Sequence, residues 1–512
     1  MLNNIPSLLN RNLKKFKKRK IIFDGGKYYN YSDLIKRVRV TVNLISNLNL
    51  KKNSKICVCM EKSIDQITII LAILSSGNIV VPILPNLKKA SIDHVIKNSD
   101  AKLIFVDKDR IEEISPKFYS LLYKFNYSKL FNEQKNNFNF INTKVSNVKI
   151  YDKDPAIIIY SSGSTGMPKG IVVPHVNLVK GAKIVSQYLK TKKSDRILGI
   201  LSFNFDYGLN QLWQTLLLGC RLYLYDYKIS YDYYKFINYH KITVLPLMPV
   251  IMALSIEYIG KIKSIKSVRY ICTSGGEVQE TVLKKLKKIF LNAKIYLMYG
   301  LTEAFRSTYL KPNKTFSKPN SIGSAIPTVK IHILKKNYEE CKEGEIGELV
   351  HRGGCISLGY YKNKIKSSKV FKKIPRFKNE IAVFSGDLVK KDKEGDIFYV
   401  GRKDNMIKTA GYRVSPTEVE KQMLKYPGVK FVCITSVYDK LRGQKIICGY
   451  TNSVLKKIDP MKFRLFLSKF LPTYMIPINF FYFKEFSITG NQGKINRPEI
   501  IKMMKDKIDK DK

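Results

Sequence analysis

Ten residues decide the fold of this chain: Ser161-Ser162-Gly163-Ser164-Thr165-Gly166-Met167-Pro168-Lys169-Gly170, which directly follow the apolar run 156–160. Glycines let backbone amides converge on phosphate oxygens, hydroxyl side chains add donors, and a lysine supplies a point charge. The stretch therefore predicts a nucleotide phosphate loop, and the competing interpretation is a flexible Ser/Gly hairpin. Its glycine spacing is not that of the GxxxxGK[ST] loop of P-loop NTPases, and the strand-like run 171–174 follows it. A different phosphate-binding fold is indicated.

Outward from this loop, short apolar runs alternate with segments long enough to form helices. Upstream, the strand-like runs 55–60, 79–83 and 102–106 alternate with the longer segments 31–48 and 63–74. Downstream, strand-like runs are separated by helix-length segments such as 278–290, and these runs are 156–160, 196–201, 221–225, 244–247, 270–273 and 294–298. The alternation predicts an α/β fold with a parallel-containing sheet covered by helices.

Two segments depart from this alternation. Segment 111–147 is rich in Asn, Lys, Phe and Tyr, and we expect a variable connection there. After Gly323 short strands and glycine turns predict a smaller β-rich subdomain. A final α/β segment begins near Asp404, with a candidate helix at 416–424 and a candidate strand at 431–436. The 512 residues exceed the roughly 150 that one domain takes on average, so we expect an N-terminal domain over 1–403 and a C-terminal domain over 404–512.

Composition excludes several classes of protein. The 91 basic and 41 acidic residues give a net charge of +50, but Lys is spread over nearly every segment and no nucleic-acid recognition motif accompanies it. We therefore expect a coding bias and no nucleic-acid partner. Eight scattered Cys predict reduced thiols, and five separated His offer no zinc cluster. No apolar run reaches the ~20 residues of a membrane span and no secretory signal is evident, so we expect a cytoplasmic protein.

Further along the chain, eight short motifs follow the phosphate loop in order: Thr273-Ser274-Gly275-Gly276-Glu277, Tyr299-Gly300-Leu301-Thr302-Glu303, Gly347-Glu348-Leu349, Ser385-Gly386-Asp387, Gly401-Arg402-Lys403-Asp404, Ile407-Lys408, Gly411-Tyr412-Arg413 and Gly493-Lys494-Ile495. With these motifs the sequence resembles the adenylate-forming superfamily of acyl-CoA synthetases, luciferases and peptide-synthetase adenylation domains. The wording of segments 205–212 and 299–310, the latter reading YGLTEAFRSTYL, looks like the AMP-ligase subgroup associated with bacterial exosortase and exopolysaccharide clusters. One such motif would be weak evidence, whereas an ordered set is strong.

The resemblance implies an enzyme that uses ATP to convert a carboxylic acid to its acyl-adenylate and passes the acyl group to a thiol. It implies an ATP site made of Ser161, Ser162, Gly163, Ser164, Thr165, Gly166, Lys169, Gly275, Gly276, Glu277, Tyr299, Gly300, Thr302, Asp387 and Arg402. Glu303 would be a ligand of Mg²⁺, which prefers oxygen ligands and often bridges one or two carboxylates to phosphates. Asp387 would accept hydrogen bonds from the ribose hydroxyls.

The resemblance also implies two catalytic lysines on one mobile C-terminal domain. Lys494 would stabilise the charge that develops when a carboxylate attacks the α-phosphate. The usual Asn-Gly-Lys triplet of the family is Gln492-Gly493-Lys494 here, a mild departure. Rotation about a hinge at Asp404 would then replace Lys494 by the loop from Lys408 to Gly411 for thiol transfer. The acceptor would be CoA or the phosphopantetheine of an acyl or peptidyl carrier protein, and the sequence does not choose between them.

The acyl pocket is expected around 205–213, with Phe205, Asp206, Leu209 and Asn210 as substrate residues. A buried Asp needs a partner, so Asp206 indicates an amino acid or another cationic acid, but an Asp that caps the following helix is an equally good interpretation. Arg306 either meets an anionic substrate or is structural or solvated. The sequence thus predicts an AMP-forming acid-thiol ligase, with an amino acid adenylating enzyme of the D-alanine ligase or peptide-synthetase type as the alternative and a non-catalytic nucleotide-binding homologue as a remote one.

Overall fold

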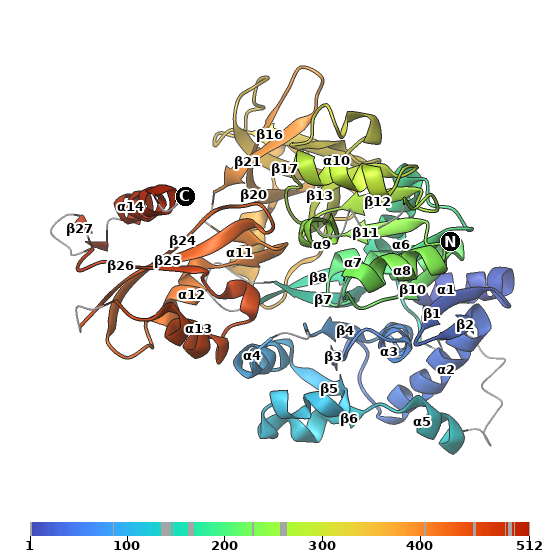
Figure 1. The fold of residues 1–512 in the computed structure, drawn as a ribbon. Coiled ribbons are helices and arrows are strands. Elements are labelled where there is room, and N and C mark those ends of the chain that lie inside the picture. The colour runs from blue at the N-terminus through green and yellow to red at the C-terminus, as the bar shows by residue number, and fades with distance from the viewer. Residues whose placement is uncertain are drawn as a thin grey trace.

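The computed structural model describes residues 3–84, 87–134, 145–146, 148–161, 168–227, 230–256, 264–403, 406–453, 457–486, 488–489, 494–495 and 497–510. Two large sheets and their covering helices form the N-terminal part of the molecule, and smaller sheets form the C-terminal part, which lies to one side (Figure 1). The described helices include none that is long and apolar enough to cross a membrane.

The smaller of the two large sheets has the strand order β18-β8-β7-β4-β3-β5-β6. Its inner strands are continuous apolar runs, typical of parallel strands that are covered on both faces, and β3 pairs in parallel with both β4 and β5. The strands are β3 (Lys55–Cys59), β4 (Ile79–Pro82), β5 (Ala101–Val106), β6 (Leu122–Lys124), β7 (Pro155–Ser161), β8 (Lys169–Pro174) and β18 (Gly359–Tyr360).

The larger sheet has the order β16-β17-β20-β21-β15-β14-β13-β12-β11-β9-β10-β1-β2, with β19 paired to β20. Strands β1, β10, β9, β11, β12 and β13 are parallel, and from β14 onward the pairing is antiparallel. The strands are β1 (Lys20–Asp24), β2 (Lys27–Asn30), β9 (Arg196–Gly199), β10 (Arg221–Leu224), β11 (Val244–Leu247), β12 (Tyr270–Thr273), β13 (Lys294–Leu301), β14 (Ala304–Leu310), β15 (Ser321–Ala325), β16 (Val329–Leu334), β17 (Gly347–Gly353), β19 (Phe371–Lys373), β20 (Ile381–Lys391) and β21 (Ile397–Arg402).

Helices fill the space between and around these sheets. The largest core cluster joins both sheets through α1, α2, α3, α6 and α7, and α2 begins with a capping box between Asn30 and Asp33. The helices are α1 (Ile5–Phe16), α2 (Tyr31–Asn47), α3 (Ile64–Ser75), α4 (Lys89–Ser99), α5 (Tyr127–Gln134), α6 (His175–Leu189), α7 (Asp206–Leu218), α8 (Ser230–Tyr239), α9 (Pro249–Ser255), α10 (Glu280–Ile289) and α11 (Lys364–Val370). Short 3-10 helices lie at Lys108–Glu113, Pro116–Leu121, Pro312–Lys314, Pro375–Phe377 and Thr473–Met475.

The C-terminal part has its own cores, one beneath α12 and α13 and one beneath α14. A three-stranded sheet, β24-β25-β26, is flanked by the hairpins β22-β23 and β27-β28. The elements are β22 (Ile407–Thr409), β23 (Tyr412–Val414), α12 (Pro416–Met423), β24 (Val429–Asp439), β25 (Gly443–Asn452), α13 (Pro460–Ser468), β26 (Asn479–Tyr482), β27 (Ile488–Thr489), β28 (Lys494–Ile495) and α14 (Arg497–Lys510).

The predicted α/β class is confirmed, and several predicted elements agree closely with the structure. The runs 244–247 and 270–273 coincide with the parallel neighbours β11 and β12. The described part of the connection 111–147 holds two 3-10 helices, β6 and α5, which is more order than the composition indicated.

Candidate active site

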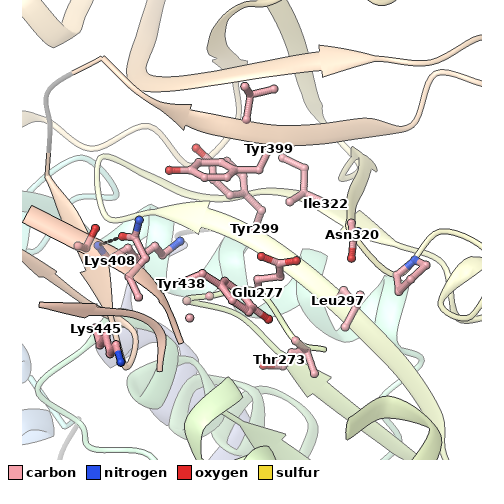
Figure 2. Close-up of a pocket in the computed structure, with 18 of the residues that line it drawn as sticks. Thr273, Glu277, Leu297, Tyr299, Asn320, Ile322, Tyr399, Lys408, Tyr438 and Lys445 are labelled. Atoms are coloured by element: carbon pink, nitrogen blue, oxygen red, sulfur yellow. Dashed lines mark hydrogen bonds between the residues drawn. The ribbon is translucent and has the colours of Figure 1, made fainter. Parts of the chain in front are cut away.

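A cavity of about 760 Å³ lies between the N-terminal sheets and the C-terminal part (Figure 2). Five residues predicted to bind ATP line it from the ends of β12 and β13, and the C-terminal part contributes Lys408, Gln444 and Lys445. The five are Gly275, Gly276, Glu277, Tyr299 and Gly300. The carboxyl ends of the parallel strands thus face the C-terminal part across the cavity. Ligand sites in open α/β sheets lie at such strand ends.

Asp387 and Arg402 meet Tyr299 at this edge. Asp387 and Arg402 are register partners on β20 and β21, and the guanidinium donates to one carboxylate oxygen while the Tyr299 hydroxyl donates to the other. Burial, reinforced by the neighbouring negative charge of Asp387, raises the pKa of Tyr299 well above its ordinary value, so its hydroxyl stays a donor. A buried carboxylate held by two donors is preorganised to accept further hydrogen bonds.

Glu303 follows β13 and is almost fully buried, with 4% of its surface exposed. The Tyr360 hydroxyl donates to Oε1, Arg413 Nη1 lies 3.9 Å from the same oxygen, and Oε2 has no hydrogen-bond partner among the described residues. An unpartnered buried carboxylate oxygen is costly and fits a hard cation as its missing partner. Within the described part of the chain no group of three or more His, Cys, Asp or Glu residues could hold a metal by itself.

The predicted phosphate loop connects the antiparallel strands β7 and β8. Ser161 ends β7 and Lys169 begins β8 as its register partner, whereas Ser162, Gly163, Ser164, Thr165 and Gly166 lie outside the described residues. Half-buried Lys169 has its pKa lowered by burial. Thr302, the other predicted phosphate contact, accepts a 2.7 Å hydrogen bond from Ser357 Oγ at its backbone oxygen.

The predicted acyl residues gather at the first turns of α7. Asp206, Leu209 and Asn210 line a cavity of about 20 Å³ together with Thr302 and residues that include Trp213 and Phe305. Phe205 instead packs edge to face on Tyr412 of the C-terminal part, with 5.7 Å between ring centroids. The N-cap of α7 is Phe205, without a side-chain cap, and Asp206 is already the first helical residue. The interpretation of Asp206 as the helix cap is therefore wrong, although its carboxylate does accept from the backbone N–H of Tyr207.

Lys408 reaches the cavity from β22. Its Nζ lies 5.9 Å from the Tyr299 ring centroid, and its backbone N–H donates to Gln444 Oε1 at 2.7 Å (Figure 2). Burial lowers the pKa of Lys408 from 10.5 to about 8, opposed by Asp387 and assisted by Arg413 and Arg402. The C-terminal part thus places a weakly basic lysine beside the carboxylate of Asp387.

Lys494 lies elsewhere. It begins β28, which pairs with β27, and Figure 1 shows β27 at the outer edge of the C-terminal part. The predicted hinge, Asp404, falls outside the described residues. The structure therefore brings Lys408 to the residues predicted to bind the nucleotide, and it holds the backbone of Lys494 in a separate hairpin.

Sequence reasoning missed two tyrosines that meet predicted residues. Tyr360 donates to Glu303 from β18. Tyr412 stacks on Tyr474 with 3.8 Å between ring centroids and forms a T-shaped pair with Phe205. No spacing in the sequence pairs position 360 with 303, because the contact depends on the pairing of β18 with β8. Tyr412 stood in a family motif and could have been singled out.

Comparison with known proteins gives a consistent picture. The family described as AMP-binding enzyme matches residues 9–361. Gramicidin S synthase 1 of Brevibacillus brevis is 29% identical over 483 residues, which are 92% of this chain and 42% of that protein. Bacitracin synthase 1 of Bacillus licheniformis is 26% identical over 94% of this chain and 9% of its own length. The chain thus spans less than half of these curated relatives.

Solved structures share the fold along nearly the whole chain. The o-succinylbenzoate CoA synthetase of Bacillus subtilis superposes with a TM-score of 0.82 at 18% identity, covering 96% of this chain and 98% of that one. An artificially fused adenylation–PCP di-domain from Klebsiella oxytoca gives a TM-score of 0.80 at 20% identity, with 94% of each chain covered.

Proposed function

Because the chain belongs to the AMP-binding enzyme family, we propose that it is an AMP-forming ligase that activates a carboxylic acid with ATP and transfers the acyl group to a thiol. In the first step a carboxylate oxygen attacks the α-phosphorus of ATP, a new oxygen–phosphorus bond forms, and pyrophosphate leaves. In the second step the thiol sulfur attacks the acyl carbon, a thioester forms, AMP leaves with the electron pair, and the thiol proton passes to solvent.

The observation that carries this proposal is the arrangement of Asp387, Glu303 and the β7–β8 hairpin at one edge of the sheets. Asp387, held by Tyr299 and Arg402, would accept from the ribose hydroxyls. Lys169 and the loop that precedes it would meet the phosphates. Glu303, whose Oε2 has no partner among the described residues, would hold Mg²⁺, which when bound neutralises phosphate charge and orients the phosphates.

We further propose that the two half-reactions use two orientations of the C-terminal domain, residues 404–512, about a hinge at Asp404. The structure has Lys408 and Gly411 facing the nucleotide residues, which suits thiol transfer, because the loop would then border the acyl-adenylate. Adenylate formation would require the β27–β28 hairpin there instead, so that Lys494 lies between carboxylate and α-phosphate. CoA or a carrier-bound phosphopantetheine would approach through the cavity beside Lys408.

A second candidate, adenylation of an amino acid, is favoured by Asp206. This half-buried side chain lies on the small acyl-side cavity, does not act as the N-cap, and forms no ion pair within the described part of the chain. Burial raises its pKa, and a substrate ammonium would supply the cation that favours its charged form. The two curated relatives described above are named as synthases of gramicidin S and of bacitracin, which is in keeping with this candidate.

The decisive experiment is ATP–pyrophosphate exchange with a panel of fatty acids, amino acids and dicarboxylic acids. We expect exchange that depends strictly on one acid class and on Mg²⁺, and transfer of that acyl group to CoA or to phosphopantetheine. Binding of ATP without exchange for any acid in the panel would overturn the ligase function and favour a nucleotide-binding homologue. Preference for a plain fatty acid would overturn the amino acid candidate alone.

A further inference from the structure

Arg306 occupies an unusual position on β14. The residue is 4% exposed and its backbone has φ +57°, a left-handed conformation that residues with a Cβ seldom adopt. Gly300 on the neighbouring strand makes room for it, because a Cβ at Gly300 would lie 2.8 Å from the Arg306 Cα. Backbone strain of this kind is commonly retained where a side chain must be aimed at a ligand.

The guanidinium of Arg306 is aimed at the acyl side of the site. It stacks 4.3 Å above the Tyr207 ring, and its Nη1 donates to Ser274 Oγ at 3.1 Å. Its Nε is buried and has no hydrogen-bond partner, and no carboxylate of the described residues lies within 4 Å of the group. The interpretation of Arg306 as a solvated residue is thus wrong, since a guanidinium buried with one hydroxyl partner lacks an anion.

Asp206 is influenced by the charge of this cation without pairing with it. Arg306 is the largest influence that lowers the pKa of the Asp206 carboxylate, while burial raises that pKa by more. The two side chains form no ion pair. The acyl side therefore presents an acceptor and a donor of opposite charge, each of which lacks an ionic partner in the part of the chain that the structure describes.

We propose that Arg306 binds a second anionic group of the acyl substrate, so that the acid activated is a short aminodicarboxylic acid whose ammonium group faces Asp206. This inference rests on the proposed ligase function. The cavities beside Asp206 and Tyr207 measure about 20 and 10 Å³, room for about one water molecule each, so only a short acid can bind there, and only after the surrounding side chains move apart. A planar guanidinium with several donors matches a carboxylate in two-point contact, which a single lysine would not.

An alternative explanation is that Arg306 only offsets the charge of Asp206. In that case the substrate needs no second anion, and a neutral group of the same shape should serve as well. The two explanations therefore differ in how the enzyme discriminates an acid from its isosteric amide.

The test compares aspartate with asparagine, glutamate with glutamine, and succinate with succinamate in ATP–pyrophosphate exchange. We expect kcat/KM for the better acidic amino acid to exceed that of its amide by about 30-fold to several thousand-fold, the range for a truncated charge pair. Arg306→Gln should reduce this ratio to a few-fold, mainly through KM, while Arg306→Lys retains part of it.

Arg352→Gln is the matched control, because Arg352 also stacks on a ring, Phe377 at 4.6 Å, but pairs with Glu380 away from the cavity. Its acid-to-amide ratio should equal that of the wild type. Equal exchange with acid and amide in the wild type, or a best substrate without a second anion, would overturn the role of Arg306 and leave the ligase standing. Absence of exchange with every acid would overturn the ligase itself. An acid-to-amide ratio in Arg306→Gln as high as in the wild type would likewise overturn the role of Arg306. Should Arg306→Gln fold poorly, the wild-type ratio and the Arg306→Lys variant still test it.

Discussion

Replacing Gly411 by alanine should separate the two half-reactions. Gly411 lies between β22 and β23 with φ +83°, and a Cβ there would lie 1.7 Å from Met248 Cε and near the Gly275 backbone oxygen. Met248 and Gly275 belong to the N-terminal part, so the added methyl group opposes the observed orientation of the C-terminal part. The alternative orientation, which brings up Lys494, does not require this contact.

The size of the effect follows from two costs. A left-handed backbone costs a residue with a Cβ roughly 1–2 kcal/mol. The contact with Met248 is with the end of a flexible side chain, so it can be relieved by a strained rotamer at about 0.5–1.5 kcal/mol. Together they amount to about 1.5–3.5 kcal/mol against the docked orientation, which corresponds to a roughly 10- to 300-fold slower transfer step at ~1.4 kcal/mol per tenfold.

Two assays measure the steps separately: ATP–pyrophosphate exchange for adenylation, and single-turnover thioester formation from a supplied acyl-adenylate. We expect exchange within about twofold of the wild type and transfer slowed as above, with Met248→Ala recovering about two- to tenfold in the double variant. Gly395→Ala is the control, since Gly395 has φ +79° and an added Cβ would meet nothing within 4 Å, and it should leave both steps unchanged. A drop in exchange as large as the drop in transfer would refute the two-orientation argument.

The site supports four further predictions. Lys494→Ala should lower exchange at least a hundredfold while thioester formation from supplied adenylate survives; equal loss of both would contradict its role. Lys408→Met should spare exchange. In the docked orientation the pKa of Lys408 is lowered from 10.5 to about 8, so this lysine loses its proton at a lower pH there and the docked state gains stability as pH rises above about 8. The ratio of the wild-type transfer rate to the variant transfer rate should therefore rise above a pH of about 8. Asp206→Ala should weaken activation of an amino acid about thirtyfold or more relative to its deaminated analogue, whereas equal losses would remove the ammonium contact. Asp387→Ala should raise KM for ATP about 10- to 100-fold and should also lower the melting temperature, because Arg402 and Tyr299 lose their buried acceptor; the two effects are measured separately.

Much of the fold could be predicted because its central strands are short apolar runs that can be recognised in the sequence alone. The runs 244–247 and 270–273 are short and apolar, the first begins after Thr243 and ends before Met248 and Pro249, and they are β11 and β12 at the same bounds. The apolar run of β13 predicts an end at 298, but the strand extends to Leu301, since Tyr299 and Leu301 pair with β14 across a register shift. A Gly-Leu-Thr motif suggests a loop locally, and only the antiparallel partner makes it part of a strand.

The candidate site could be predicted in its residue types but not in its contacts. Motif order indicated Asp387 and Tyr299 as separate nucleotide residues, whereas the hydrogen bond between them depends on β13 and β20 meeting at one edge of the cavity. Tyr360 meets Glu303 from a strand that belongs to the other large sheet. Such pairings are set by tertiary packing, for which local sequence holds no period or spacing.

Two motif glycines show that a residue in a predicted ligand-binding motif can also be required for packing. The motif around Gly300 predicts ATP binding, and Gly300 does line the cavity, yet a Cβ at this position would press on the Arg306 backbone. Met248 of the N-terminal part leaves no room for a side chain at Gly411. A glycine that faces a ligand and a glycine that admits a neighbour look the same in sequence. The difference matters for the proposed reaction, because Gly300 would shape the acyl side through Arg306, and Gly411 would govern which face of the C-terminal part reaches the site.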